Sequence, residues 1–144
     1  MNIDIYNSAI HDTWAYLLLN MLPILIGGIA LIVIALIGLY KKIMRKSILF
    51  PLLVLGVIVS SYSIVEMYVF NYDIQHKNFA VYHGDFNYMQ VSGNRKDVFE
   101  ISDKSYLYIR SVADLNISTG SHSGYLLYGK SSHWVIAYSD TQFE

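Results

Sequence analysis

Two histidines and an aspartate lie close together in the second half of the chain, but they fall short of a metal site. His83 and Asp85 are two residues apart, a spacing that places both on one face of a strand, and His76 lies a few residues earlier. A metal ion needs three or more convergent ligands supported by an outer shell of hydrogen bonds. Gly84-Asp85 is also typical of a turn. We therefore interpret His83 and Asp85 as an exposed pair at the end of a strand, and we predict no metal.

Serines surround two further histidines without completing a hydrolase motif. His122 lies between Ser121 and Ser123, and His133 follows Ser131-Ser132. A nucleophile elbow has the pattern G-x-S-x-G, which the chain does not contain. The chain also has no Cys, which excludes disulfides, thiolate metal sites and cysteine nucleophiles. These observations predict that the protein is not an enzyme and that it has no cofactor.

Charged residues are sparse and are missing altogether from two long stretches. They make up 15% of the 144 residues, against about 25% in soluble domains, and 54% of the residues are apolar. No charged side chain occurs between Thr13 and Tyr40 or between Ser47 and Val65. A helix of about 20 apolar residues crosses a bilayer. We therefore predict a membrane α-helical hairpin of two spans within residues 14–72, surrounded by membrane lipid and preceded by a short N-terminal tail of residues 1–13.

Two other interpretations of these stretches are less well supported. A signal peptide begins with basic residues and has a short apolar core, but the segment before Trp14 contains Asp4 and Asp12 and no Lys or Arg, so we expect no cleavage. The other alternative is a pair of core helices in a soluble protein. Stretches this apolar are hard to bury in so short a chain.

Positive charge sets the expected orientation. The link between the two stretches, residues 41–46, holds Lys41, Lys42, Arg45 and Lys46, whereas the N-terminal tail has no Lys or Arg. Loops with such an excess stay in the cytoplasm. We therefore predict an integral protein of a bacterial inner (plasma) membrane with both termini outside the cytoplasm. Because 10 basic residues balance 11 acidic ones, we expect no nucleic-acid partner.

Small residues and one acid within the spans have possible functional meanings. Gly27-Gly28 in the first span, and Gly56 and Ser60 in the second, allow helix backbones to approach closely. We interpret them as packing positions within the hairpin, and a homo-oligomer is the open alternative. Glu66 lies near the outer end of the second span, where we expect a structural role at the membrane boundary.

Residues 73–144 change to short alternating runs separated by turn residues. This pattern predicts an extracytoplasmic, all-β domain, built as an antiparallel meander. An OB-like barrel is the architecture we expect first, because closure leaves few open edges, and a small sandwich is the alternative. We expect aromatic residues, including Phe99 and Trp134, to face its core. The expected strands are Phe79–His83, Phe86–Ser92, Val98–Ile101, Tyr106–Arg110, Tyr125–Tyr128 and His133–Tyr138.

The segment from Val112 to Ser123 is the longest part of this domain without a strand or helix pattern. It is polar and built of small residues, and such loops commonly carry binding sites. Tyrosine-rich strands flank it, and Tyr offers a large contact area at a small cost in side-chain entropy. The candidate partner-binding residues are therefore Asn116, Ser121, His122, Tyr108 and Tyr125.

The expected function is that of a membrane-anchored, non-enzymatic binding or accessory module that presents its β domain outside the cytoplasm. Its partner would be another envelope protein or a peptide. The alternative is a toxin or bacteriocin immunity protein acting at the inner membrane, which the small size and the two spans also suit. A toxin gene beside the gene for this chain would favour the alternative.

Overall fold

The structure is a computed structural model that describes residues 3–43, 45–92, 96–109 and 117–142. Its chain forms two compact units. One is the central part of two helices, Leu17–Tyr68, and the other contains the β domain together with the residues up to Tyr16 and from Val69 onward. The dividing points lie within a few residues of positions 14 and 72, the limits of the two spans suggested by the sequence.

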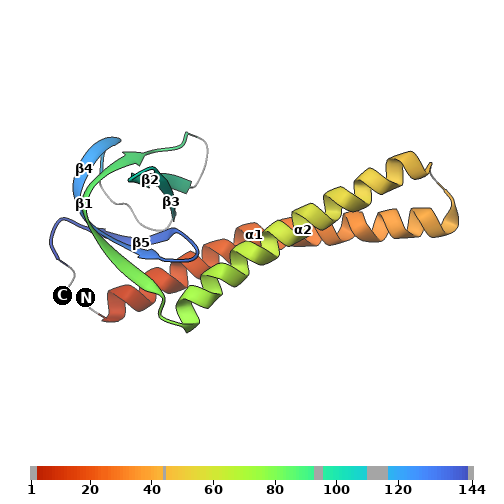
Figure 1. The fold of residues 1–144 in the computed structure, drawn as a ribbon. Helices are drawn as coiled ribbons and strands as arrows, with labels where there is room; N and C mark the ends of the chain where they lie inside the picture. Colours follow the sequence, from red (N-terminus) through yellow and green to blue (C-terminus); the bar gives the residue numbers. More distant parts are fainter. Residues whose placement is uncertain (1–2, 44, 93–95, 110–116, 143–144) are drawn as a thin grey trace. The chain divides into compact units, whose positions relative to one another are not determined.

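The first half of the chain is helical. Helix α1 covers Ile3–Lys41 and helix α2 covers Lys46–Gln75 (Figure 1). Both are long and apolar enough to cross a membrane, as predicted. Helix α1 already begins at Ile3, so most of the segment 1–13, which we expected as a tail, is part of the first helix.

Within the unit Leu17–Tyr68, the two helices approach closely at small residues. A Cβ atom added to Gly28 would lie 2.9 Å from the backbone nitrogen of Ser60 and 3.0 Å from the carbonyl oxygen of Gly56. These distances are too short for a side chain at Gly28. Gly27, the next residue along α1, has open space around it. The prediction of packing within the hairpin is therefore confirmed for Gly28 and Gly56, and it does not extend to Gly27.

The difference between Gly27 and Gly28 gives a matched pair of variants. We expect Gly28→Leu to push the helices apart and to lower the melting temperature of the purified protein in detergent, because helices in membranes associate through close packing. Gly27→Leu should leave the melting temperature unchanged within a few degrees. Equal melting temperatures for the two variants would contradict the close approach at Gly28.

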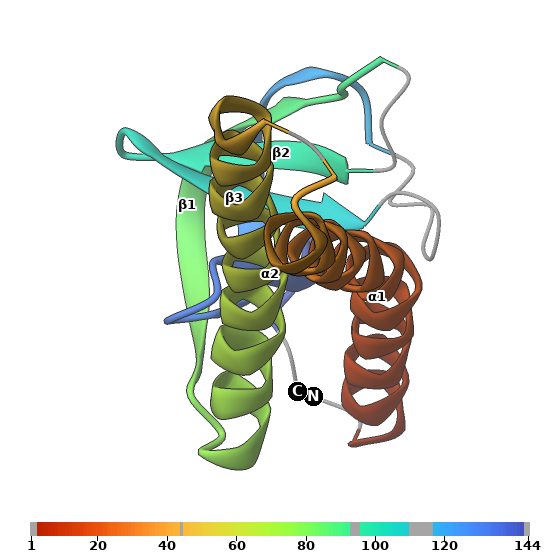
Figure 2. The ribbon, with the colours of Figure 1, turned by 90° about the vertical axis from the view of Figure 1, so that its right-hand side faces the viewer.

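Five strands follow the helices and close into a barrel. Around the barrel their order is β1-β2-β3-β5-β4, and Figure 2 shows β1, β2 and β3 as neighbours. The predicted small barrel of the OB type is confirmed, and the sandwich is not formed. The meander was expected to be antiparallel throughout, which is wrong for β3 and β5, because these strands pair in parallel. The strands are β1 (Phe79–Met89), β2 (Lys96–Ile101), β3 (Lys104–Ile109), β4 (Gly120–Gly129) and β5 (Trp134–Ser139).

Strand β1 is one long strand, although Gly84-Asp85 was expected to be a turn between two shorter ones. Gly84 has a φ of 152°, a value that favours glycine, and it pairs with Gly124 of β4. A Cβ atom at Gly84 would lie 2.8 Å from the Tyr82 hydroxyl oxygen, and one at Gly124 would lie 2.8 Å from Cε2 of Tyr138. The two glycines therefore leave room for two tyrosine side chains, and the chain passes through this point without reversing.

The barrel core is aromatic, as predicted. The side chain of Phe99 is fully buried, and its ring centroid lies 5.2 Å from that of Phe86, 5.0 Å from that of Tyr88 and 5.8 Å from that of Tyr108. Aromatic pairs at such distances add to the stabilisation from burial alone. The other buried members of the core are Ile101, Tyr106, Leu126 and Val135.

Trp134 is also fully buried, but it lies on the outer side of the barrel, which corrects the expectation that it faces the core. Its neighbour Val135 belongs to the core cluster, and side chains alternate along a strand, so Trp134 points outward. Its ring centroid lies 6.2 Å from that of Tyr16 in α1. Tyr16 thus covers the outer side of the barrel at Trp134.

Candidate binding surface

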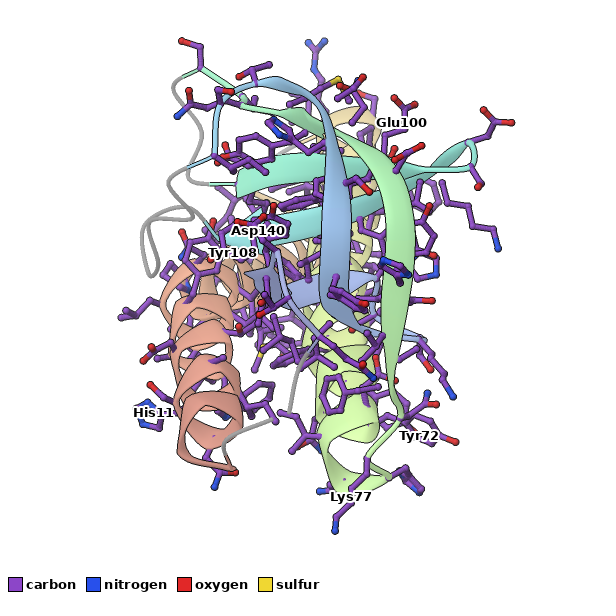
Figure 3. The ribbon with its side chains drawn as sticks, turned by 90° about the vertical axis from the view of Figure 1, so that its left-hand side faces the viewer. His11, Tyr72, Lys77, Glu100, Tyr108 and Asp140 are labelled. Atoms are coloured by element: carbon purple, nitrogen blue, oxygen red, sulfur yellow. The ribbon has the colours of Figure 1, made fainter. Side chains whose placement is uncertain are left out.

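The pairing of β1 with β4 creates the longest two-stranded surface of the barrel, and Figure 3 looks onto these two strands. Paired residues of antiparallel strands point to the same side. Because Phe86 and Tyr88 face the core, the alternate residues of β1 face outward. We name the outward set on both strands the β1–β4 face. It consists of Val81, His83, Asp85 and Asn87 on β1, and of Leu127, Tyr125, Ser123 and Ser121 opposite them on β4.

An aromatic stack occupies the middle of the β1–β4 face. The rings of His83 and Tyr125 lie 4.2 Å apart between centroids, at an interplanar angle of 12°. Val81, the next outward residue along β1, is 52% exposed, and His83 is also exposed. The face therefore offers a flat aromatic pair beside an open aliphatic side chain, and Tyr is among the residues enriched in protein interfaces.

The polar part of the β1–β4 face carries an uncompensated negative charge. Asp85 is exposed and pairs across the strands with Ser123. Between residues that the structure describes, the only ion pair within 4.0 Å joins His11 and Asp12. Asp85 is therefore available to a cationic or hydrogen-bonding group of a partner.

Neither a protein-family model, nor a curated protein, nor a solved structure matches this chain. The functional argument therefore depends on the geometry of its own residues.

The structure places the five candidate residues from the sequence in different environments. Ser121 and Tyr125 lie on the β1–β4 face. His122 pairs with the inward-facing Phe86, and its Nε2 atom lies 2.5 Å from the carbonyl oxygen of Ser118. Tyr108 is buried in the barrel core (Figure 3). Asn116 lies outside the described residues.

The loop that was expected to carry the binding site is shorter than predicted. Strand β4 begins at Gly120, so Ser121 and His122 belong to a strand and the segment from Val112 does not extend as a loop to Ser123. Sequence reasoning missed the stacking contact of His83, because its partner Tyr125 is distant in the chain. The alternation of outward residues along each strand could be predicted from the sequence. The register of β1 against β4 could not.

A second cluster, which the sequence did not suggest, holds the loop between β4 and β5. Asp73, in the last turn of α2, has no solvent-accessible surface. Its carboxylate accepts hydrogen bonds from the backbone nitrogen of Ser132 at 2.8 Å, from that of Ser131 at 3.2 Å and from Nδ2 of Asn78 at 2.7 Å. The backbone nitrogen of Lys130 also donates to the carbonyl oxygen of Asn78 at 3.0 Å. We call this arrangement the Asp73 clamp.

The Asp73 clamp limits which surface of the barrel is open to a partner. OB-type barrels commonly bind ligands with their second and third strands and with the loops that follow the first and fourth strands. Here the loop after β4 is held by Asp73, and the outer side of β5 is covered by Tyr16 at Trp134. On the β1–β4 face Leu127 is buried, whereas five other members are exposed: Val81, His83, Asp85, Ser121 and Ser123.

Tyr138 lies beneath the β1–β4 face and is not a titrating group at neutral pH. Burial, followed by the hydrogen bond that its hydroxyl donates to Asp140 and by the charge of that carboxylate, raises the pKa of Tyr138 to about 12. Its ring contacts Phe86 in an edge-on geometry, with 5.6 Å between centroids. Tyr138 therefore supports the face from inside as a neutral phenol.

Proposed function

We propose that this protein is a membrane-anchored, non-enzymatic binding module whose barrel docks another envelope protein or a peptide outside the cytoplasm. The observation that carries the proposal is the stack of exposed His83 on half-buried Tyr125, beside exposed Val81, on the outer surface of a closed barrel. Tyr is enriched among the few residues that dominate binding energies at interfaces. The partner would cover the aromatic pair and place a cationic or hydrogen-bonding group near Asp85.

The unit Leu17–Tyr68 supports the anchoring part of the proposal. Its stretches of α1 and α2 each rise about 35 Å, which is enough for a hydrocarbon core of about 30 Å. Many of its large apolar side chains are exposed, among them Leu19, Ile34 and Phe50. Such side chains are stable next to lipid tails and costly next to water. The four cations of residues 41–46 favour a cytoplasmic position for the link, and hence an extracytoplasmic barrel.

Site-specific photocrosslinking in living cells tests the docking surface. A photoreactive amino acid at His83 or at Ser121 should give one reproducible crosslinked band, and the same group at Asp103, in the turn after β2, should not. Labelling at the two face positions no stronger than at Asp103 would exclude the β1–β4 face. If the partner in the band is a secreted toxin, the immunity role would apply instead of an accessory role.

A pair of alanine variants tests whether the aromatic stack itself holds the partner. With the photoreactive group at Ser121, Tyr125→Ala should reduce the crosslinked fraction by about tenfold or more, because truncating a dominant interface residue costs about 2 kcal/mol. Lys104→Ala, at an exposed position at the start of β3, is the matched control and should leave the fraction unchanged. Equal yields in the two variants would contradict the role of the stack.

A further inference from the structure

Strand β1 has a paired strand on both sides along only part of its length. Strand β4 pairs with residues 79–88, whereas β2 pairs only with residues 87–89. Among the strands that the structure describes, none pairs with the second side of β1 at residues 80–85, a stretch that we call the β1 edge. Alternate residues of such a strand direct their N–H and C=O groups away from the one neighbour. The β1 edge therefore presents a row of backbone donors and acceptors.

The β1 edge is open to solvent. Its outward members are all exposed: Val81, His83 and Asp85. Tyr82 packs against the core and yet is only half-buried, whereas Tyr88, where β1 has both neighbours, is buried. Beyond the pairing with β4, one hydrogen bond between described residues involves the β1 edge, from the Tyr82 hydroxyl to the carbonyl oxygen of Asp85 at 2.7 Å.

The two segments of the barrel outside the described residues adjoin the other end of β1. Segment 93–95 leads into Lys96, and segment 110–116 follows Ile109, which pairs with Lys96. After segment 110–116 the chain enters β4 at Gly120, which pairs with Tyr88. The β1 edge leads away from Tyr88, toward the start of the strand.

Acidic side chains lie at the end of the β1 edge next to β2. Asp85 is exposed at this end. Glu100, which pairs with Asn87, and Asp103, in the turn after β2, are exposed as well. These three acids outnumber the neighbouring Lys104, so the charge at this end is negative.

Two lysines lie at the opposite end of the β1 edge. Lys77 precedes the strand by two residues, and Lys130 follows Gly129, the partner of Phe79. Both lysines are exposed. Asp73 also lies at this end, but it is buried in the Asp73 clamp, so the exposed charge there is positive. Figure 3 shows Glu100 and Lys77 at opposite ends of β1.

We propose that the β1 edge binds an extended segment of the partner protein as an added antiparallel strand, with a basic residue at the N-terminal end of that segment and an acidic residue at its C-terminal end. The inference rests on the proposed docking function and adds the mode of binding. Main-chain hydrogen bonds give an added strand its affinity, and alternate side chains give its specificity.

The charges at the two ends follow from the direction of the added strand. Antiparallel pairing is slightly more stable per residue than parallel pairing. Because β1 runs from Lys77 toward Asp85, an antiparallel segment begins beside Asp85 and ends beside Lys77. Its outward side chains then lie next to Val81 and His83 and continue the β1–β4 face. Six residues of strand cover roughly 20 Å, the length of the β1 edge.

A strand peptide tests the main-chain pairing with the purified full-length protein in detergent. The peptide has a lysine, six alternating threonines and valines with a photoreactive group among them, and a final glutamate. Two isomers carry N-methyl groups on alternate amides, one set on each side of the strand. One isomer should crosslink as well as the parent peptide and the other about fivefold less, because only one side faces β1. Equal crosslinking by the isomers, or none by the parent peptide at millimolar concentration, would overturn the proposal.

A reversed peptide tests the direction of the added strand. With glutamate first and lysine last, it should crosslink about threefold less than the parent peptide, because like charges then meet at both ends. Asp85→Lys should abolish this preference. Asp12→Lys is the matched control and should retain it, since Figure 3 shows the adjacent His11 on α1, well away from β1. Equal yields of the two peptides with the unchanged protein would overturn the antiparallel direction.

Competition in spheroplasts separates this proposal from the docking function on which it rests. With the photoreactive amino acid at Ser121, the strand peptide should reduce the partner band about threefold or more, and the inactive N-methyl isomer should not. A band that the strand peptide leaves unchanged would overturn binding at the β1 edge and leave the docking surface in place. Absence of any band from both His83 and Ser121 would instead refute the docking function.

Discussion

Replacing Phe99 by alanine should lower the free energy of unfolding of the barrel by about 3–5 kcal/mol, which is comparable with the entire stability of so small a domain. Phe99 is fully buried, and its ring contacts three other aromatic rings of the core. Its removal leaves a cavity that these rings cannot fill without leaving their preferred geometries. Urea unfolding of the full-length protein in mild detergent, followed by near-UV circular dichroism, measures the loss of aromatic packing separately from the helices.

Two further variants make the Phe99 experiment specific. Phe99→Leu keeps most of the apolar volume and should cost less than half as much. Val98→Ala changes the adjacent, half-buried residue on the outer side of β2 and should cost about 1 kcal/mol or less. A cost below 1 kcal/mol for Phe99→Ala would contradict the description of the core.

Replacing Asp73 by alanine should cost about 2–4 kcal/mol, because it leaves three part-buried donors without their acceptor. The backbone nitrogens of Ser131 and Ser132 both donate to this carboxylate, and so does the side chain of Asn78. Without these hydrogen bonds, the loop between β4 and β5 loses its attachment to the end of α2. Hydrogen exchange at the amides of Ser131 and Ser132 should then become faster by at least tenfold, whereas exchange at the core strands β1 and β2 should change less.

The control for the Asp73 clamp is a change of charge without loss of shape. Asp73→Asn retains one acceptor oxygen and should give an intermediate cost. Glu100→Gln makes the same chemical change at an exposed position and should have no effect on stability. If Asp73→Ala leaves exchange at Ser132 unchanged, the loop does not depend on the clamp.

The elements that could be predicted from the sequence are those fixed by local patterns. The charge-free stretches gave helices α1 and α2, and both helices are long and apolar enough to cross a membrane. Alternation within a few residues gave the strands around Phe99 and Tyr106, and it gave their core-facing sides. The closed barrel followed from the number of short strands and the need to pair their edges.

The features that could not be predicted depend on contacts between distant residues. Gly84-Asp85 has the composition of a turn. It lies within a strand because Gly84 pairs with Gly124 and leaves room for the Tyr82 side chain. The stack of His83 on Tyr125 requires the register of β1 against β4. Asp73 ends an apolar helix, and nothing in its local sequence indicates that its acceptors serve a loop near the C-terminus.

The central claim, a barrel held outside the cytoplasm by a hairpin with a cytoplasmic tip, has a direct test. Because the chain has no Cys, single cysteines at Glu100 on β2 and at Ile43 in the link can be labelled without background. Both positions are exposed. In intact spheroplasts, a membrane-impermeant maleimide should label Glu100→Cys at once and Ile43→Cys only after permeabilisation. Labelling of Ile43→Cys with protection of Glu100→Cys would reverse the orientation, and equal labelling of both in intact cells would contradict the two membrane spans.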